Sequence, residues 1–152
     1  MDNAIRRVIE HACQHLSIAY AHTADFGHDA AFANLFTDDA VLETSLVQVR
    51  GKAEIEASMK KRPAELRSRH IITNMLIDVI DEDHARGLSY LSLYRHVGPE
   101  SLQSEPIDVS GPAIIGHYDD RFVRTPMGWR FERRKLHVAF RRAASFPTER
   151  EG

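Results

Sequence analysis

The chain has 152 residues, with 20 basic and 22 acidic side chains and a formal net charge of −2. A chain of this length buries about 69% of its unfolded surface, which predicts one domain with a real core. Apolar runs of only a few residues exclude a membrane-spanning helix, and the balanced charge gives no reason to expect nucleic acid or a membrane surface as partner. The single cysteine, Cys13, excludes a disulfide framework and a cysteine-ligated metal site. With no secretory signal in the sequence, we expect a cytoplasmic protein.

Helical spacing dominates the first part of the chain. Apolar side chains recur every three or four residues, with Asp2 or Asn3 available as the N-cap, until Gly27 breaks the pattern. Pro63 ends a later amphipathic run. The elements predicted here are helices over 3–24, 29–36 and 52–61, a turn at 37–39, and one or two short strands over 40–49.

The second part of the chain is typical of β-strands. It is rich in β-branched residues, and its turns are the acidic cluster 81–83 and the Pro126–Gly128 segment. The predicted strands cover 70–81, 84–97, 112–125 and 128–142, with one long loop over 98–110. The tail, 143–152, has no apolar period, so we expect a single domain over 1–142 followed by a flexible tail.

Helices followed by long antiparallel strands indicate an α+β fold. A long sheet twists, and three amphipathic helices need a surface to cover. We therefore expect a curved, mixed or antiparallel sheet that wraps around the N-terminal helices as a half-open cone. The cone would enclose an apolar pocket between the sheet and the first helix. Because the outer face of such a sheet needs cover, we also expect a homodimer or homotrimer.

Among nine histidines, His70 stands out because it opens the first long predicted strand. Asp25 closes the first helix, where the chain should pack against the sheet, so the two side chains can meet inside the pocket. A carboxylate beside an imidazole makes the ring a competent general base. Pattern alone favours a simpler interpretation, a helix-end carboxylate and a strand-end histidine. His11 and His15 have metal-binding spacing but no accompanying glutamate, so we predict two solvated side chains and no metal site.

Strand alternation places Tyr118, Asp120 and Arg124 on one face of the third long strand. Asp120 and Arg124 would pair with each other or bind a polar group, and an ordinary ion pair near a sheet edge is the alternative. A basic cluster follows in the last strand, including Arg133 and Arg134. We expect this cluster to cover helices or a neighbouring subunit rather than to bind nucleic acid.

Several motifs together resemble a known family. They are Tyr20-x4-Asp25, Leu35-Phe36-Thr37-Asp38-Asp39-Ala40, His70-x3-Asn74, Gly116-x-Tyr118-x-Asp120-x3-Arg124 and Gly128-Trp129-Arg130-Phe131. Over about residues 3–140 the chain resembles the SnoaL-like branch of the nuclear-transport-factor-2-like superfamily, which includes scytalone dehydratase and hexachlorocyclohexane dehydrochlorinase. The resemblance implies a cystatin-like α+β barrel whose pocket holds the chemistry.

Position by position, the resemblance implies that Asp25 and His70 match the Asp–His dyad of the dehydratase and the dehydrochlorinase. It also implies that Arg124 lines the pocket. Two tyrosines that hold a water in the fungal dehydratase fall at Ala24 and Thr44 here, which speaks against scytalone itself as the substrate.

The function we predict is a dehydratase-like carbon–oxygen lyase that catalyses β-elimination on a small, cyclic, largely apolar substrate without a metal or organic cofactor. His70 would remove a proton, Asp25 would orient it, Tyr118 would donate to the developing oxyanion, and Arg124 would bind the leaving group. Further substrate-binding residues are predicted at Tyr20, Asn74, Tyr90, Tyr94 and Asp120. Activity is expected to fall in acid as His70 takes up a proton.

Two other functions stay open from the sequence. A ketosteroid isomerase-like enzyme would use the same cone with Asp25 as the base. A non-catalytic module, such as a ligand-binding pocket or an assembly subunit like the β subunit of ring-hydroxylating dioxygenases, would have an occluded pocket or a large apolar outer face.

Overall fold

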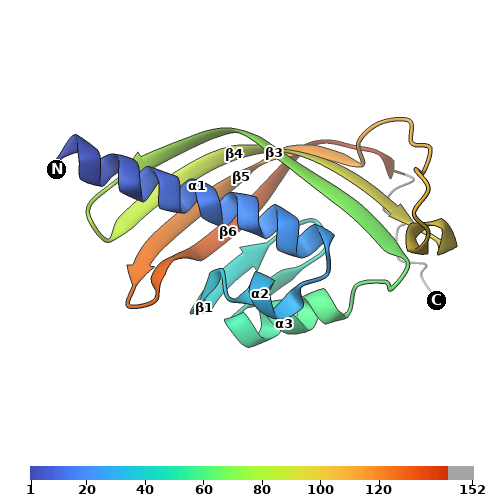
Figure 1. Cartoon of the computed structure of the whole chain (residues 1–152), viewed down its shortest axis with the longest axis horizontal. Coiled ribbons are helices and arrows are strands. Elements are labelled where there is room, and N and C mark those ends of the chain that lie inside the picture. The colour runs from blue at the N-terminus through green and yellow to red at the C-terminus, as the bar shows by residue number, and fades with distance from the viewer. Residues whose placement is uncertain (144–152) are drawn as a thin grey trace.

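The computed structural model describes residues 1–143 and shows three helices packed on one curved sheet (Figure 1). The elements in chain order are α1 (Asn3–Asp25), α2 (Asp29–Ala33), β1 (Phe36–Glu43), β2 (Gln48–Arg50), α3 (Lys52–Lys60), β3 (Leu66–Val79), β4 (His84–Val97), the 3₁₀ turn η1 (Pro99–Leu102), β5 (Ile114–Thr125) and β6 (Gly128–Arg141). None of the described helices is both long enough and apolar enough to cross a membrane. Of the tail expected over 143–152, residues 144–152 lie outside the described part of the chain.

The sheet has the strand order β2-β1-β6-β5-β4-β3. Every neighbouring pair is antiparallel except β1 and β6, which run parallel, so the sheet is mixed. Its four long strands curve around α1, which lies across the concave face, while α2 and α3 pack near β1 (Figure 1). The predicted α+β cone is confirmed.

Helix α1 forms where the sequence predicts it. The Asp2 carboxylate caps the helix by accepting from the backbone N–H of Ala4 at 3.1 Å. One face of the helix is buried against the sheet, with Cys13 and Tyr20 among its fully enclosed side chains. The helix extends to Asp25, one residue past the predicted end, before the chain turns at Gly27 with a φ of 71°.

The second predicted helix and the turn after it are corrected by the structure. Helix α2 ends at Ala33, and the predicted turn at 37–39 is part of strand β1. The reason is tertiary, because Phe36 pairs with Phe131 in the sheet and the Phe131 N–H donates to the Leu35 carbonyl at 2.8 Å. This pairing outweighs the turn preference of the two aspartates in the segment.

Two of the β-bulges in the sheet change the facing of residues near the cavity or the core. In β6, Phe131 lies opposite Phe122 but Arg133 lies opposite Arg121, so Glu132 is one residue more than the partner strand holds. In β3, the register shifts between Thr73 and Leu76. After each bulge, alternate side chains swap faces of the sheet.

The concave face carries the core and the convex face carries exposed apolar side chains. Phe32, Phe36, Phe122 and Phe131 are all at most 2% exposed and form the aromatic centre of the core. The exposed apolar side chains of the strands' outer face include Ile71, Leu88, Tyr90, Ile115 and Phe140. The homodimer or homotrimer expected from the sequence stays a prediction.

Candidate active site

The Asp25 and His70 side chains meet where α1 ends beside the start of β3. The imidazole Nδ1 lies 2.6 Å from Asp25 Oδ1, which also accepts from the Ser68 hydroxyl at 2.9 Å. Oδ2 accepts from the His70 backbone N–H at 2.8 Å. A carboxylate at Nδ1 favours the tautomer with its proton there, which leaves the lone pair on Nε2. Pairing of the helix end with the strand therefore fixes both the position and the tautomer of the ring.

The electrostatics of this pair favour an ionised carboxylate. The Asp25 and His70 side chains are only 6% and 13% exposed. Burial by itself raises the pKa of Asp25, but hydrogen bonds from the His70 ring and backbone and from Ser68, together with the charge of His70, outweigh it and lower the pKa below its ordinary value. The surroundings of Asp25 thus favour its carboxylate form.

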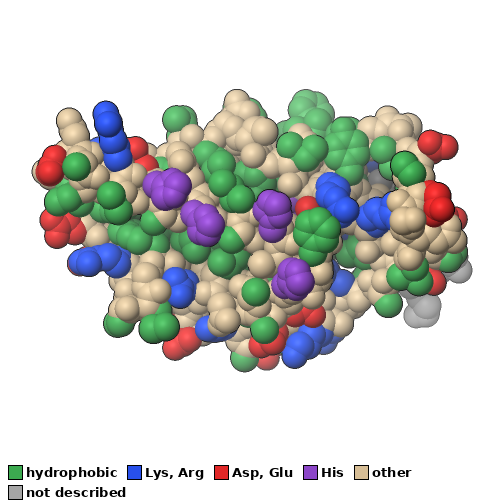
Figure 2. All heavy atoms as spheres, in the orientation of Figure 1, with side chains coloured by type: hydrophobic (Ala, Val, Ile, Leu, Met, Phe, Trp, Pro, Cys, Tyr) green, Lys and Arg blue, Asp and Glu red, His purple; other side chains and the backbone are tan. Residues whose placement is uncertain are grey.

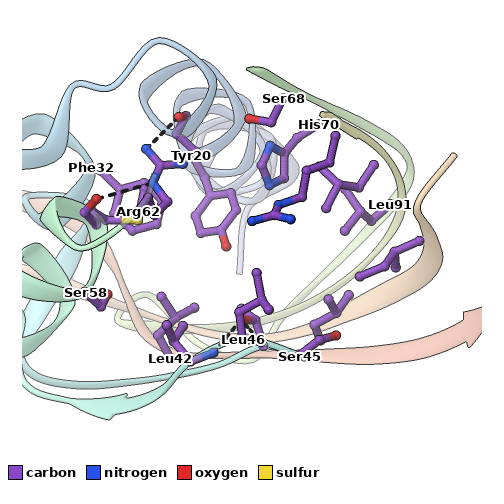
Figure 3. Close-up of a pocket in the computed structure, with 18 of the residues that line it drawn as sticks. Tyr20, Phe32, Leu42, Ser45, Leu46, Ser58, Arg62, Ser68, His70 and Leu91 are labelled. Atoms are coloured by element: carbon purple, nitrogen blue, oxygen red, sulfur yellow. Dashed lines mark hydrogen bonds between the residues drawn. The ribbon is translucent and has the colours of Figure 1, made fainter. Parts of the chain in front are cut away.

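His70 forms part of the wall of a cavity between α1, α3 and the concave face of the sheet (Figure 3). The cavity has a volume of about 120 Å³. An apolar cavity of roughly 150 Å³ holds a benzene ring, so this space suits about one six-membered ring. Its apolar lining residues include Phe32, Leu42, Leu91, Leu93, Ile114 and Leu136.

Two buried tyrosines also line the cavity. In Figure 3 the Tyr20 ring lies between Arg62 and His70, with its hydroxyl directed into the open space. The centroids of the Tyr20 and His70 rings are 6.0 Å apart in an edge-on arrangement. Tyr118, only 1% exposed, packs edge-on against Tyr20 at 5.5 Å. Of the predicted substrate-binding residues, Tyr20 is the one that lines the cavity.

Asp120 is buried next to this site rather than in it. It pairs with Arg134, directly opposite on β6, through Nε–Oδ1 and Nη2–Oδ2 contacts of 2.9 and 3.2 Å. The guanidinium carbon lies 4.3, 3.7 and 4.6 Å from the ring centres of Tyr20, Tyr118 and Phe131. Burial raises the pKa of Asp120 to about 6, although the Arg134 charge lowers it, so the carboxylate is ionised at neutral pH.

The predicted pairing of Asp120 with Arg124 is wrong, because Asp120 pairs with Arg134 instead. Arg134 belongs to the basic cluster that the sequence predicts to cover helices or a neighbouring subunit, and its Nη2 donates to the Ser17 hydroxyl of α1 at 3.1 Å. Arg134 is completely buried. Arg124 lies at the far end of β5 with a side chain that is 52% exposed, and its Nη2 is 2.7 Å from Asp83 in the turn between β3 and β4. Arg124 shares a strand face with Tyr118, but six residues along a strand span about 20 Å, which takes it past the cavity. Arg124 does not line the pocket.

Asn74, Tyr90 and Tyr94 also fall outside the cavity lining. Asn74 is exposed at the β3 bulge, where its φ of 52° places it in the left-handed region. Tyr90 is 56% exposed and lies on the convex face with Tyr94, because alternation in β4 turns Leu91 and Leu93 inward. These three predicted substrate contacts are therefore wrong for this cavity.

Sequence reasoning missed two arginines that do line the cavity, Arg62 and Arg95. Arg62 follows α3, and its Nη2 donates to the Ala24 carbonyl at 2.9 Å. Arg95 has the same parity in β4 as Leu91 and Leu93. That parity, a charged residue in phase with inward-facing leucines, is the sequence signal that could have identified Arg95.

A comparison with protein families finds that a model of the SnoaL-like domain matches residues 8–135. No curated protein matches the sequence. A solved structure of a candidate scytalone dehydratase from Novosphingobium aromaticivorans superposes with a TM-score of 0.77 at 18% identity, covering 97% of this chain and 94% of that one.

Two further solved structures have the same fold. A protein of unknown function from Mycobacterium tuberculosis has a TM-score of 0.74 at 23% identity, with 95% of this chain and 80% of that chain covered. A hexachlorocyclohexane dehydrochlorinase has a TM-score of 0.74 at 15% identity, with 91% and 90% covered. At these identities the superpositions show a shared fold.

Proposed function

This chain belongs to the SnoaL-like family, and we propose that it is a lyase that catalyses cofactor-free β-elimination on a small cyclic substrate. One observation carries the proposal. His70 lies on the wall of an apolar cavity with its Nδ1 held by a nearly buried carboxylate, Asp25. This arrangement is that of a general base with an orienting partner. The dehydratase and dehydrochlorinase among the similar folds are consistent with an elimination.

In the proposed reaction, Nε2 of His70 removes a proton from the substrate carbon next to an activating carbonyl. The electron pair of that C–H bond forms the new C=C bond, and the bond from the neighbouring carbon to its hydroxyl group breaks. The imidazolium returns its proton to the departing oxygen, which leaves as water, so His70 is regenerated. Asp25 stabilises the imidazolium, and proton transfer of this kind contributes about 10²–10⁴-fold to the rate.

A tyrosine hydroxyl would stabilise the charge that develops on the activating carbonyl oxygen. Tyr20 is the better placed donor, because its hydroxyl is directed into the cavity beside His70 (Figure 3). Tyr118, proposed from the sequence, lines the same cavity and packs against Tyr20.

The alternatives draw less support from the site. Asp25 is absent from the described residues that line the cavity, and both of its oxygens accept hydrogen bonds from Ser68 or His70, which disfavours an isomerase with Asp25 as its base. A purely structural module has no need of an open cavity with a carboxylate-held imidazole in its wall.

The test is the His70→Gln variant, assayed with cyclic β-hydroxy ketones such as 3-hydroxycyclohexanone and its ring-carboxylated analogue 3-hydroxy-5-oxocyclohexane-1-carboxylate. Loss of water from either compound gives a conjugated enone with ultraviolet absorbance. We expect turnover to fall by about 10²–10⁴-fold while the fold is kept, because glutamine preserves a hydrogen bond to Asp25. Tyr90→Phe, on the exposed outer face, is the matched control and should keep full activity. A fully active His70→Gln variant, or a chain that eliminates none of these ketones, contradicts the proposal.

A further inference from the structure

The charge on the cavity wall has one sign. Among the described residues that line the cavity, Arg62 and Arg95 carry positive charge, His70 can acquire it, and none carries negative charge. The remaining lining is mostly aliphatic or aromatic. Two guanidinium groups on the wall of a small apolar space favour a ligand that brings a negative charge to them.

Arg62 is held in place by the backbone around it. Its Nη2 donates to the carbonyl of Ala24 in the last turn of α1, and its Nε donates to the carbonyl of Met59 at 3.4 Å. Asp29 Oδ1 also lies 3.9 Å from Nη2. The guanidinium is thus fixed at the cavity edge before any ligand arrives, which reduces the entropy cost of binding.

Arg62 and Arg95 are close enough to influence each other. Burial lowers the pKa of Arg95, and repulsion from the Arg62 charge lowers it further. Burial also lowers the pKa of Arg62. A ligand with a negative group near both guanidiniums would relieve this repulsion and replace part of the lost hydration.

A hollow next to the cavity also has more basic than acidic side chains in its lining. It shares Arg62 and Ser68 with the cavity, and its lining includes four basic side chains, Lys60, Arg62, Arg67 and Arg69, against two acidic ones, Asp25 and Asp29. In Figure 2, Lys and Arg side chains gather beside the end of α1, where this hollow lies. A positive approach of this kind raises the local concentration of anions.

We propose that the ligand of the cavity is a small monocyclic carboxylic acid, bound as its carboxylate by Arg62 and Arg95 with its ring on the apolar floor. The inference rests on the proposed function for its chemical meaning, because it names the substrate class of that site. A carboxylate neutralised by guanidiniums also makes the neighbouring C–H more acidic, and His70 lies on the same wall, with Tyr20 between His70 and Arg62 (Figure 3).

The test uses benzoate as a probe that the protein cannot turn over, with benzamide as its neutral counterpart of the same shape. Isothermal titration calorimetry should show that benzoate binds about tenfold or more tightly than benzamide. Arg62→Met and Arg95→Met should each remove most of that preference, because each should weaken benzoate binding far more than benzamide binding. Arg62→Lys and Arg95→Lys should restore part of it, which separates lost charge from lost folding.

Arg121→Met, on the exposed outer face, is the matched control and should bind benzoate as the unaltered chain does. Equal affinity for benzoate and benzamide, or benzoate binding that persists in both methionine variants, overturns the inference. The His70→Gln variant should also keep benzoate binding. If it does, and yet loses no turnover, then the proposed elimination fails while the carboxylate site stands.

Discussion

Asp25 with His70 and Asp120 with Arg134 are two buried carboxylates, each held by a basic side chain on the concave side of one sheet, and the two pairs differ in what surrounds them. The Asp120–Arg134 pair is 2% and 0% exposed and is enclosed by aromatic rings, away from the cavity. The Asp25–His70 pair is also nearly buried, but its imidazole faces the cavity. Tyr20 contacts both pairs, lying against Arg134 on one side and His70 on the other.

The difference teaches that access decides the role of a buried carboxylate and its basic partner. Both pairs have short contacts, and both join elements distant in sequence. Only the pair whose base reaches an open space can exchange a proton with a ligand. The sealed pair can contribute only to the stability and specificity of the fold. Three predictions separate these roles.

The largest effect is expected from breaking the sealed pair. Arg134→Met leaves the Asp120 carboxylate buried without its partner, and we expect the free energy of unfolding to fall by about 3–5 kcal/mol. Urea unfolding followed by circular dichroism measures this loss. The double variant Asp120→Leu with Arg134→Met should recover much of it, because no uncompensated charge then remains in the core.

Arg133→Met is the matched control for this experiment. Arg133 is the neighbouring arginine on the opposite face, with a 40% exposed side chain 3.6 Å from Glu43. Its loss should cost at most about 1 kcal/mol. Equal losses for Arg133→Met and Arg134→Met would contradict the contrast between the two faces.

A smaller effect on stability is expected at the accessible pair. Asp25→Asn weakens hydrogen bonds to a charged acceptor, which should cost about 1–3 kcal/mol and lower the turnover of the ketones. Because the pKa of Asp25 is lowered in the folded state, its carboxylate contributes stability above the ordinary value of 3.8 that is lost as the pH falls toward the folded value. The difference between the two chains should therefore be largest at neutral pH and shrink in acid. If the difference in the free energy of unfolding between the two chains grew below pH 3.8, the prediction that the Asp25 pKa is lowered by folding would be contradicted.

The smallest effect is expected at Arg124, the arginine that the family resemblance placed in the pocket. Its ion pair with Asp83 is more than half exposed on both sides, so Arg124→Gln should change the free energy of unfolding by less than about 1 kcal/mol. Turnover and benzoate affinity should not change. Loss of activity in this variant would mean that the strand end reaches the substrate after all.

The sequence correctly predicts the elements whose hydrophobic periodicity is strong, such as α1 and β4. It also predicts the contact between Asp25 and His70. Strand β4 begins and ends at the predicted residues, and α1 is longer by a single residue. The sequence predicts the contact of Asp25 with His70 from a helix end and a strand start. Strand β3 begins earlier than predicted, at Leu66, but the contact forms. Local pattern and fold class agree there, so the geometry could be anticipated.

Side-chain facing in the strands is where prediction fails. Continuous alternation from Phe131 would turn Arg133 inward and Arg134 outward, but the bulge reverses both. Asn74 is misplaced for the same reason in β3. A bulge depends on the partner strand and leaves little trace in one sequence, so the burial of Arg134 could not be derived from periodicity.

Glu132 is therefore the residue of β6 at which the alternation of inward and outward side chains changes phase. The bulge at this residue decides which of two adjacent arginines enters the protein and which meets solvent, without any change in the arginines themselves. If the same residues paired without the bulge, Arg133 would turn inward and Arg134 outward. When β6 is aligned with the corresponding strand of a relative, the placement of gaps near Glu132 therefore matters. It determines whether two aligned residues lie on the same face of the sheet.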